Sequence, residues 1–115
     1  RAWLERALAR AGAGAEPAPL WAYDPDAWWR IQDVNVRGVF LGTRAAMRRM
    51  VPRGRGRVVN VTSRTGHVAV AYASAYSTSK TAVTRLTEIA AVEGAPHGVR
   101  VFALEPGTVR TAMTQ

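Results

Sequence analysis

The chain has 115 residues, of which 48% are hydrophobic, so it is large enough for one domain with a single core and too small for two. It contains no cysteine, which excludes disulfide bonds, thiolate nucleophiles and cysteine-based metal sites, and this composition favours a reducing compartment, the cytoplasm. No segment approaches the roughly 18 to 20 apolar residues that a membrane-spanning helix needs, so we expect no membrane span.

The net charge of +8 is densest in the tract PRGRGR at residues 52–57, which raises the question of a polyanionic partner. No aromatic residue is interleaved with these arginines, and no zinc-finger, helix-turn-helix or RNA-binding signature accompanies them. We therefore interpret the tract as a solvated turn before a strand and expect no nucleic-acid partner.

The N-terminal part of the chain reads as a helical pattern followed by a loop and then by two joined helices. In the loop, residues 11–20, Gly12 and Gly14 begin a dinucleotide-binding fingerprint, but Pro17 stands where its third glycine belongs. Asp24 and Pro25 have the residue types of a helix N-cap and first turn, and apolar residues then recur at helical spacing as far as Met50. The small residues of this run would let the helix approach a sheet closely; they are Gly38, Gly42, Thr43 and Ala46. We expect a short helix leading into a longer one, with a bend near Asn35.

The C-terminal part alternates strand, helix and strand. Residues 57–63, RVVNVTS, form a β-branched run typical of a strand buried on both faces. Residues 76–93 have a helical pattern, with Val83, Leu86, Ala90 and Ala91 expected to face inward. Residues 99–105 predict a second buried strand, which Pro106 and Gly107 stop. This alternating order predicts an α/β fold in which helices pack over a parallel sheet.

One lysine stands among fifteen arginines, and it follows Tyr76 by four residues. On a helix, Tyr76 and Lys80 would share one face, so the ammonium could favour the phenolate form of the tyrosine, which is otherwise a poor base. A lysine suits this role better than an arginine because its charge is compact and its donors rotate. Such a pair also occurs without function on many exposed helices. Ser63, however, lies at the carboxyl end of a predicted parallel strand, where α/β sheets bind ligands.

A strand-end serine, then Tyr-x-x-x-Lys opening a helix, then a strand ending in Pro-Gly closely resembles the C-terminal catalytic half of the short-chain dehydrogenase/reductase family. The resemblance runs from about Pro19 to Met113. It implies a partial Rossmann-like, doubly wound parallel sheet whose first βαβ units are missing. Residues 1–18 would be a divergent N-terminal segment, and residues 19–115 would be the catalytic half of the domain. We therefore expect the chain to be a fragment.

The resemblance also implies a role for each matching residue. Ser63 would orient the substrate carbonyl or alcohol, Tyr76 would act as general acid and base and contact the cofactor, and Lys80 would assist Tyr76 and hold the nicotinamide ribose. Asn35 matches the asparagine that supports a water in the proton relay, and Asn60 matches a structural strand asparagine. The loop that borders the nicotinamide would contain Pro106, Gly107, Val109 and Thr111.

The family implies NAD or NADP as cofactor, a small carbonyl or alcohol substrate, and a homodimer or homotetramer formed through helices 32–50 and 76–93. The residue that would choose between the two cofactors is absent, as is the glycine-rich phosphate loop, so we expect the isolated chain to turn over little or not at all. Phe102 stands where the family usually has asparagine. We expect no metal site, because His67 and His97 stand apart from other ligand types. Two alternatives stay open: a truncated remnant that cannot bind cofactor, and a basic nucleic-acid-binding module.

Overall fold

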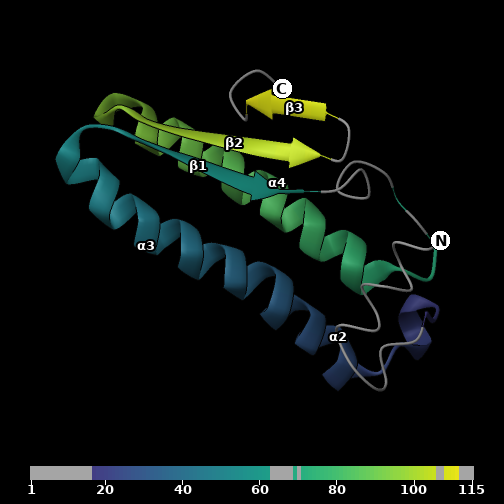
Figure 1. Cartoon of the computed structure of the whole chain (residues 1–115). Coiled ribbons are helices and arrows are strands. Elements are labelled where there is room, and N and C mark those ends of the chain that lie inside the picture. The colour runs from purple at the N-terminus through teal and green to yellow at the C-terminus, as the bar shows by residue number, and fades with distance from the viewer. Residues whose placement is uncertain (1–16, 63–68, 70, 106–107, 112–115) are drawn as a thin grey trace.

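The computed structural model describes residues 17–62, 69, 71–105 and 108–111. The described elements follow one another as η1 (Leu20–Ala22), α2 (Pro25–Gln32), the π turn η2 (Asp33–Arg37), α3 (Gly38–Arg53), β1 (Gly56–Val61), α4 (Ser74–Gly94), η4 (Ala95–His97), β2 (Val99–Glu105) and β3 (Thr108–Thr111). Figure 1 shows a layer of strands packed over the two long helices α3 and α4.

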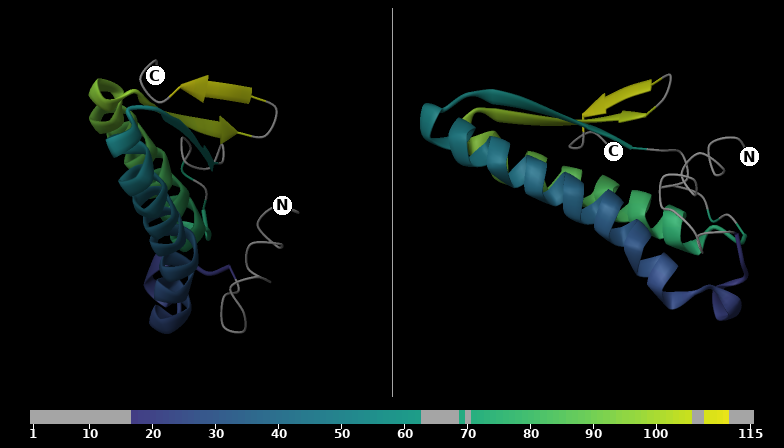
Figure 2. Two further views of the ribbon diagram at one scale, coloured as in Figure 1. Left: turned by 60° about the vertical axis from the view of Figure 1, so that its left-hand side comes forward. Right: turned by 60° about the horizontal axis from the view of Figure 1, so that its bottom comes forward.

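The sheet confirms the parallel pairing that the alternating sequence predicted. β1 and β2 are parallel, in a register that runs from Gly56 opposite Val99 to Val61 opposite Leu104. α3 and α4 lie side by side on the same face of this sheet, as the two views of Figure 2 agree. The observed α/β architecture is therefore the predicted one.

Residues 108–111 were expected to be part of a loop, and this expectation was wrong. They form strand β3, which pairs antiparallel with β2 and places Val109 opposite Leu104. Three of its four residues are β-branched, which suits a strand, and the pairing satisfies backbone groups on the outer edge of β2.

Near Asn35, where a bend was expected, the structure has a π turn within a continuous helix. Asp24 caps α2, since its carboxylate accepts a hydrogen bond of 2.9 Å from the backbone N–H of Ala27, and Pro25 occupies the first helical position. The helix then continues through the five residues of η2, with Asn35 at their centre, directly into α3. Single π turns inside α-helices are frequent at functional sites, which draws attention to Asn35.

Two apolar clusters hold the helices to each other and to the sheet. The larger cluster joins α4 to β2 through Ala90, Ala91, Val99 and Val101, and side chains of α3 and β1 pack against it. The smaller cluster joins α2 to the start of α4 through Ala27, Ile31 and Ala75, together with Tyr23. Val83 is fully buried as predicted, whereas Leu86 is only half-buried.

The predicted burial was wrong at two places. Val59 and Val61 leave more than half of their surface exposed, so β1 is covered on one face and not on both. No described helix packs over the other face, which explains the difference. Gly38 and Gly42 are also exposed, with nothing within 4 Å of an added Cβ, so they do not bring α3 close to the sheet.

A polar clasp connects β1 to both long helices. The amide of Asn60 donates to the hydroxyl of Thr87 at 3.0 Å and to that of Thr43 at 3.3 Å. The hydroxyl of Thr87 in turn donates to the carbonyl of Val83, so it acts as both a hydrogen-bond acceptor and a donor. Because the three side chains come from β1, α3 and α4, the clasp fixes the spacing of the layers, which is the structural role expected for Asn60.

Among the described residues, no helix is both long enough and apolar enough to cross a bilayer. The same part of the chain contains no group of histidine, aspartate and glutamate side chains that could hold a metal ion. His97 is exposed in η4, and His67 lies outside the described residues.

Candidate active site

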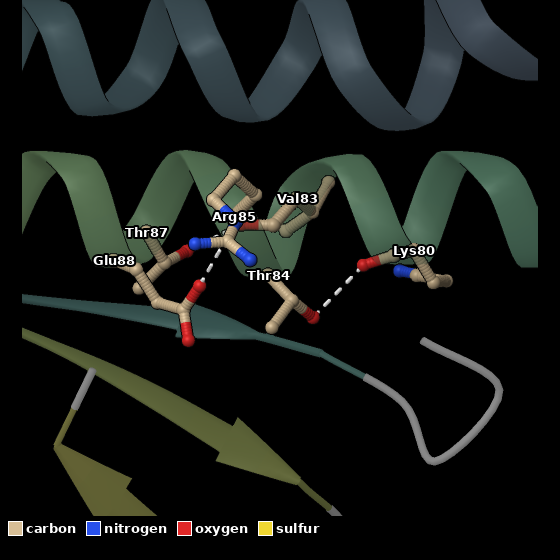
Figure 3. A network of polar contacts seen from close by, with 6 residues as sticks. All are labelled: Lys80, Val83, Thr84, Arg85, Thr87 and Glu88. Atoms are coloured by element: carbon tan, nitrogen blue, oxygen red, sulfur yellow. Dashed lines mark hydrogen bonds and ion pairs between the residues drawn. The ribbon is translucent and has the colours of Figure 1, made fainter. Parts of the chain in front are cut away.

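The first two turns of α4 carry Tyr76 and Lys80 on one face, as their spacing predicted. Tyr76 is buried, with 7% of its surface exposed, and the ammonium of Lys80 lies 5.7 Å from the centroid of its ring. Figure 3 shows the next turn of α4, where the hydroxyl of Thr84 donates to the carbonyl of Lys80 at 2.9 Å. The helix therefore holds a cation over a nearly buried phenol.

The site lies at the edge of the sheet where parallel strands place their ligands. β1 and β2 both point toward the end of the molecule at which α4 begins (Figure 1). The backbone N–H of Thr62 donates to the carbonyl of Leu104 at 2.8 Å and extends the ladder one residue past β1. Ser63 is the next residue and lies outside the described residues.

Three side chains of α2 and η2 hold the start of α4 in place. The indole N–H of Trp28 donates to the hydroxyl of Ser74 at 3.1 Å, and the amide of Gln32 donates to the carbonyl of Ala75 at 2.8 Å. The amide of Asn35 donates to the hydroxyl of Ser79 at 3.0 Å. The side chain of Asn35 therefore reaches the turn of α4 that carries the tyrosine and the lysine.

Ser79 was not predicted to belong to the site. It is completely buried, and its hydroxyl donates to the backbone carbonyl of Tyr76 at 2.7 Å. A sequence signal was available: Ser79 is a polar residue three positions after Tyr76, on the face of the helix that the hydrophobic pattern buries. Trp28 and Gln32 gave no such signal, because their partners lie more than 40 residues away along the chain.

The residues expected beside the nicotinamide are only partly described. Pro106 and Gly107 lie outside the described residues. Val109 and Thr111 lie in β3, opposite Leu104 and Phe102 of β2. β3 begins with Thr108 opposite Glu105, at the edge of the sheet where β1 also ends, and runs back from that edge as far as Thr111.

Comparison with known proteins assigns this arrangement to a family. The model of the short chain dehydrogenase family matches residues 8–115. A cyclopentanol dehydrogenase of Comamonas testosteroni is 47% identical over 88 residues, which cover 76% of this chain and 35% of that protein. The chain spans about 40% of the length of the curated relatives it matches.

Solved structures have the same fold. A gluconate 5-dehydrogenase from Burkholderia cenocepacia, in complex with NADP and tartrate, has a TM-score of 0.74 and 31% identity, over 90% of this chain and 44% of that one. An NAD⁺-bound xylitol dehydrogenase has a TM-score of 0.73 and 37% identity, over 83% of this chain and 37% of that one.

Proposed function

Because the chain belongs to the short-chain dehydrogenase family, we propose that it forms the catalytic half of an NAD- or NADP-dependent oxidoreductase that acts on a small carbonyl compound or secondary alcohol. The observation that carries this proposal is the ammonium of Lys80, 5.7 Å from the ring of the nearly buried Tyr76 at the start of α4. The relatives named above act on alcohols of different shapes, so the proposal covers a class of reaction and does not name a single substrate.

In the proposed mechanism, Tyr76 exchanges the proton on the substrate oxygen. The positive charge of Lys80 stabilises the negative charge that develops on the tyrosine oxygen when the proton leaves it. The nicotinamide, when bound, supplies or accepts the hydride at the substrate carbon. Ser63 would orient the substrate oxygen, and Asn35 would support the relay that returns the proton to solvent.

The chemistry of the described residues fits the nicotinamide end of such a cofactor. Lys80 is half-buried, and its three rotatable N–H donors suit the two hydroxyls of a ribose. The remaining contacts are proposed from the family motif alone, namely those of Pro106, Gly107, Val109 and Thr111. The glycine-rich phosphate loop of the family does not occur in these 115 residues.

We extend the proposal to domain organisation and assembly. Residues 19–115 would be the catalytic half of the domain, and residues 1–18 a divergent segment, although the family match begins at residue 8. Subunits would pair through α3 and α4, which carry exposed apolar side chains; these are Phe40, Leu41, Ile89 and Val92.

The substitution Tyr76→Phe tests the proposed proton transfer. The chain is fused behind the N-terminal half of the Comamonas cyclopentanol dehydrogenase, which by family resemblance carries the phosphate loop. Phenylalanine keeps the ring beneath Lys80 and removes only the hydroxyl, so we expect the turnover of cyclopentanol to fall by about 10²- to 10⁴-fold. The affinity for the cofactor, measured by calorimetry, should change little. Undiminished turnover would show that Tyr76 is not the proton donor.

A second candidate function is a remnant that keeps the catalytic residues and binds no cofactor; in its favour, Phe102 stands where the family usually has asparagine. The same fusion separates the two candidates. A remnant would give neither turnover nor binding of NAD(H) or NADP(H), even with the loop supplied.

A further inference from the structure

Ser79 is a polar residue in a completely buried position, and its one hydroxyl is used twice. It donates to the carbonyl of Tyr76 at 2.7 Å and accepts from the amide of Asn35 at 3.0 Å. A buried hydroxyl with both partners satisfied has a defined direction, so it fixes the distance between the two groups it joins. The two groups here are the centre of the π turn and the turn of α4 that carries Tyr76.

The backbone carbonyl of Tyr76 also takes part in the helical hydrogen bond that links Tyr76 to Lys80. In an α-helix the backbone N–H of residue i bonds to the carbonyl of residue i−4, and Lys80 is four residues after Tyr76. The hydroxyl of Ser79 therefore bonds to the same carbonyl that accepts the helical hydrogen bond from the backbone N–H of Lys80. The hydrogen bonds of Trp28 and Gln32 go to other groups of α4, the hydroxyl of Ser74 and the carbonyl of Ala75.

We propose that Ser79 is a positioning residue, whose hydroxyl couples the π turn at Asn35 to the turn of α4 that carries Tyr76 and Lys80. The proposal rests on the proposed function, because it deepens the role of that pair. In it, Asn35 acts on the pair through Ser79, in addition to its family role in the relay. Loss of the hydroxyl would let the first turns of α4 shift against η2 and would change how the ammonium sits over the ring.

The composition of the chain offers a direct measurement of that geometry. Lys80 is the only lysine, so incorporation of ¹³C-labelled lysine gives a single set of side-chain NMR signals. The ammonium lies 5.7 Å from the Tyr76 ring, and the ring current will displace the signal of the adjacent methylene. The position of the same signal in the urea-unfolded chain supplies the undisplaced reference. The measurement needs neither cofactor nor turnover.

We expect Ser79→Ala to move the Lys80 signal at least halfway toward its unfolded position while the circular dichroism stays that of a folded chain. Asn35→Ala should move the signal in the same direction, and the double variant should move it no further than the larger single change. If Ser79→Ala fails to fold, the nearly isosteric Ser79→Cys carries the same test, because a thiol forms only weak hydrogen bonds.

Ser74→Ala is the matched control. It is also a serine-to-alanine change, and it removes a hydrogen bond of similar length between the same helices, but one that does not involve the carbonyl of Tyr76. We expect it to leave the Lys80 signal in place. An unmoved signal in folded Ser79→Ala, or an equal movement in Ser74→Ala, would overturn the proposal.

The outcome is separable from that of the proposed function. If Tyr76→Phe keeps its turnover while the Lys80 signal depends on Ser79, the coupling exists and the catalytic assignment is wrong. If Tyr76→Phe loses its turnover while Ser79→Ala leaves the Lys80 signal in place, the catalytic assignment holds and the positioning role is wrong.

Discussion

Lys80 combines two properties that no other cation among the described residues has. Its ammonium lies over the ring of Tyr76, an arrangement that contributes roughly 0.5 to 2 kcal/mol depending on how far the cation is removed from water. Its charge is a point at the end of a flexible stem, whereas the other fifteen cationic side chains carry planar guanidinium groups. The site therefore depends on the shape of this charge as well as on its sign.

We predict that Lys80→Arg impairs catalysis although it conserves the charge. A guanidinium is wider than an ammonium and cannot rotate its donors, so we expect kcat of the fused enzyme to fall by up to about 10²-fold, as a misplacement of about 1 Å can produce. The midpoint of urea unfolding should change little. Arg85→Lys, on the exposed face of the same helix, is the reverse exchange and should leave both quantities unchanged. Full activity of Lys80→Arg would mean that only the charge matters.

The residues of the site differ in how far the sequence predicted them. The spacing of Tyr76 and Lys80 predicted their meeting, because helix geometry alone decides which residues share a face. The role of Ser79 depends on Asn35, which lies 44 residues earlier in the chain, and no local pattern encodes that contact. The sequence predicted a bend near Asn35 and did not predict the π turn that the structure has there. Local geometry was therefore predictable, and the partners across the fold were not.

The turn that precedes β1 and the turn that precedes β2 pack against each other through their backbones. Gly54 ends α3 with φ of +71°, and Gly98 ends η4 with φ of +75°. A Cβ on Gly98 would collide with the carbonyl oxygen of Gly54, whereas a Cβ on Gly54 would meet nothing within 4 Å. The close approach lets β1 and β2 begin in register, with Gly56 opposite Val99.

Three glycine-to-alanine variants should differ in their free energy of unfolding according to these environments. Gly42→Ala lies in a helix and points into open space, so we expect it to stabilise the fold by about 0.5 to 1 kcal/mol. Gly54→Ala keeps the left-handed conformation and should destabilise by about 1 to 2 kcal/mol. Gly98→Ala adds the collision and should destabilise the fold further than Gly54→Ala. Urea unfolding followed by circular dichroism measures all three, and any other order would contradict the described packing.

The bounds of the elements followed from local sequence better than their burial did. β2 spans residues 99–105 in both the prediction and the structure, because a mainly apolar run ends before Pro106. Val59 and Val61 have equally apolar sequence surroundings, yet they are exposed, since their burial requires a surface that the described residues do not contain. Burial depends on the whole fold, and a pattern within one strand predicts it only when both faces have partners.

Two of the exposed apolar surfaces among the described residues differ in the kind of association they favour. One is the uncovered face of β1, at Val59 and Val61, beside an edge at which β1 pairs with no described strand. The other lies on α4, at Ile89 and Val92, which are 46% and 63% exposed. An open strand edge beside an apolar face favours indefinite association, whereas a helical face can be buried in a closed, symmetric pair.

We predict that these surfaces produce different assemblies of the 115-residue chain. Ile89→Lys would place a charge in the proposed helical interface, so it should convert dimers to monomers. Val59→Lys would place a charge beside the open edge, so it should suppress species larger than the dimer and leave the dimer itself intact. Sedimentation velocity at several protein concentrations distinguishes these outcomes. Dimers that survive Ile89→Lys would rule out pairing through α4, and large species that survive Val59→Lys would show that association does not proceed through β1.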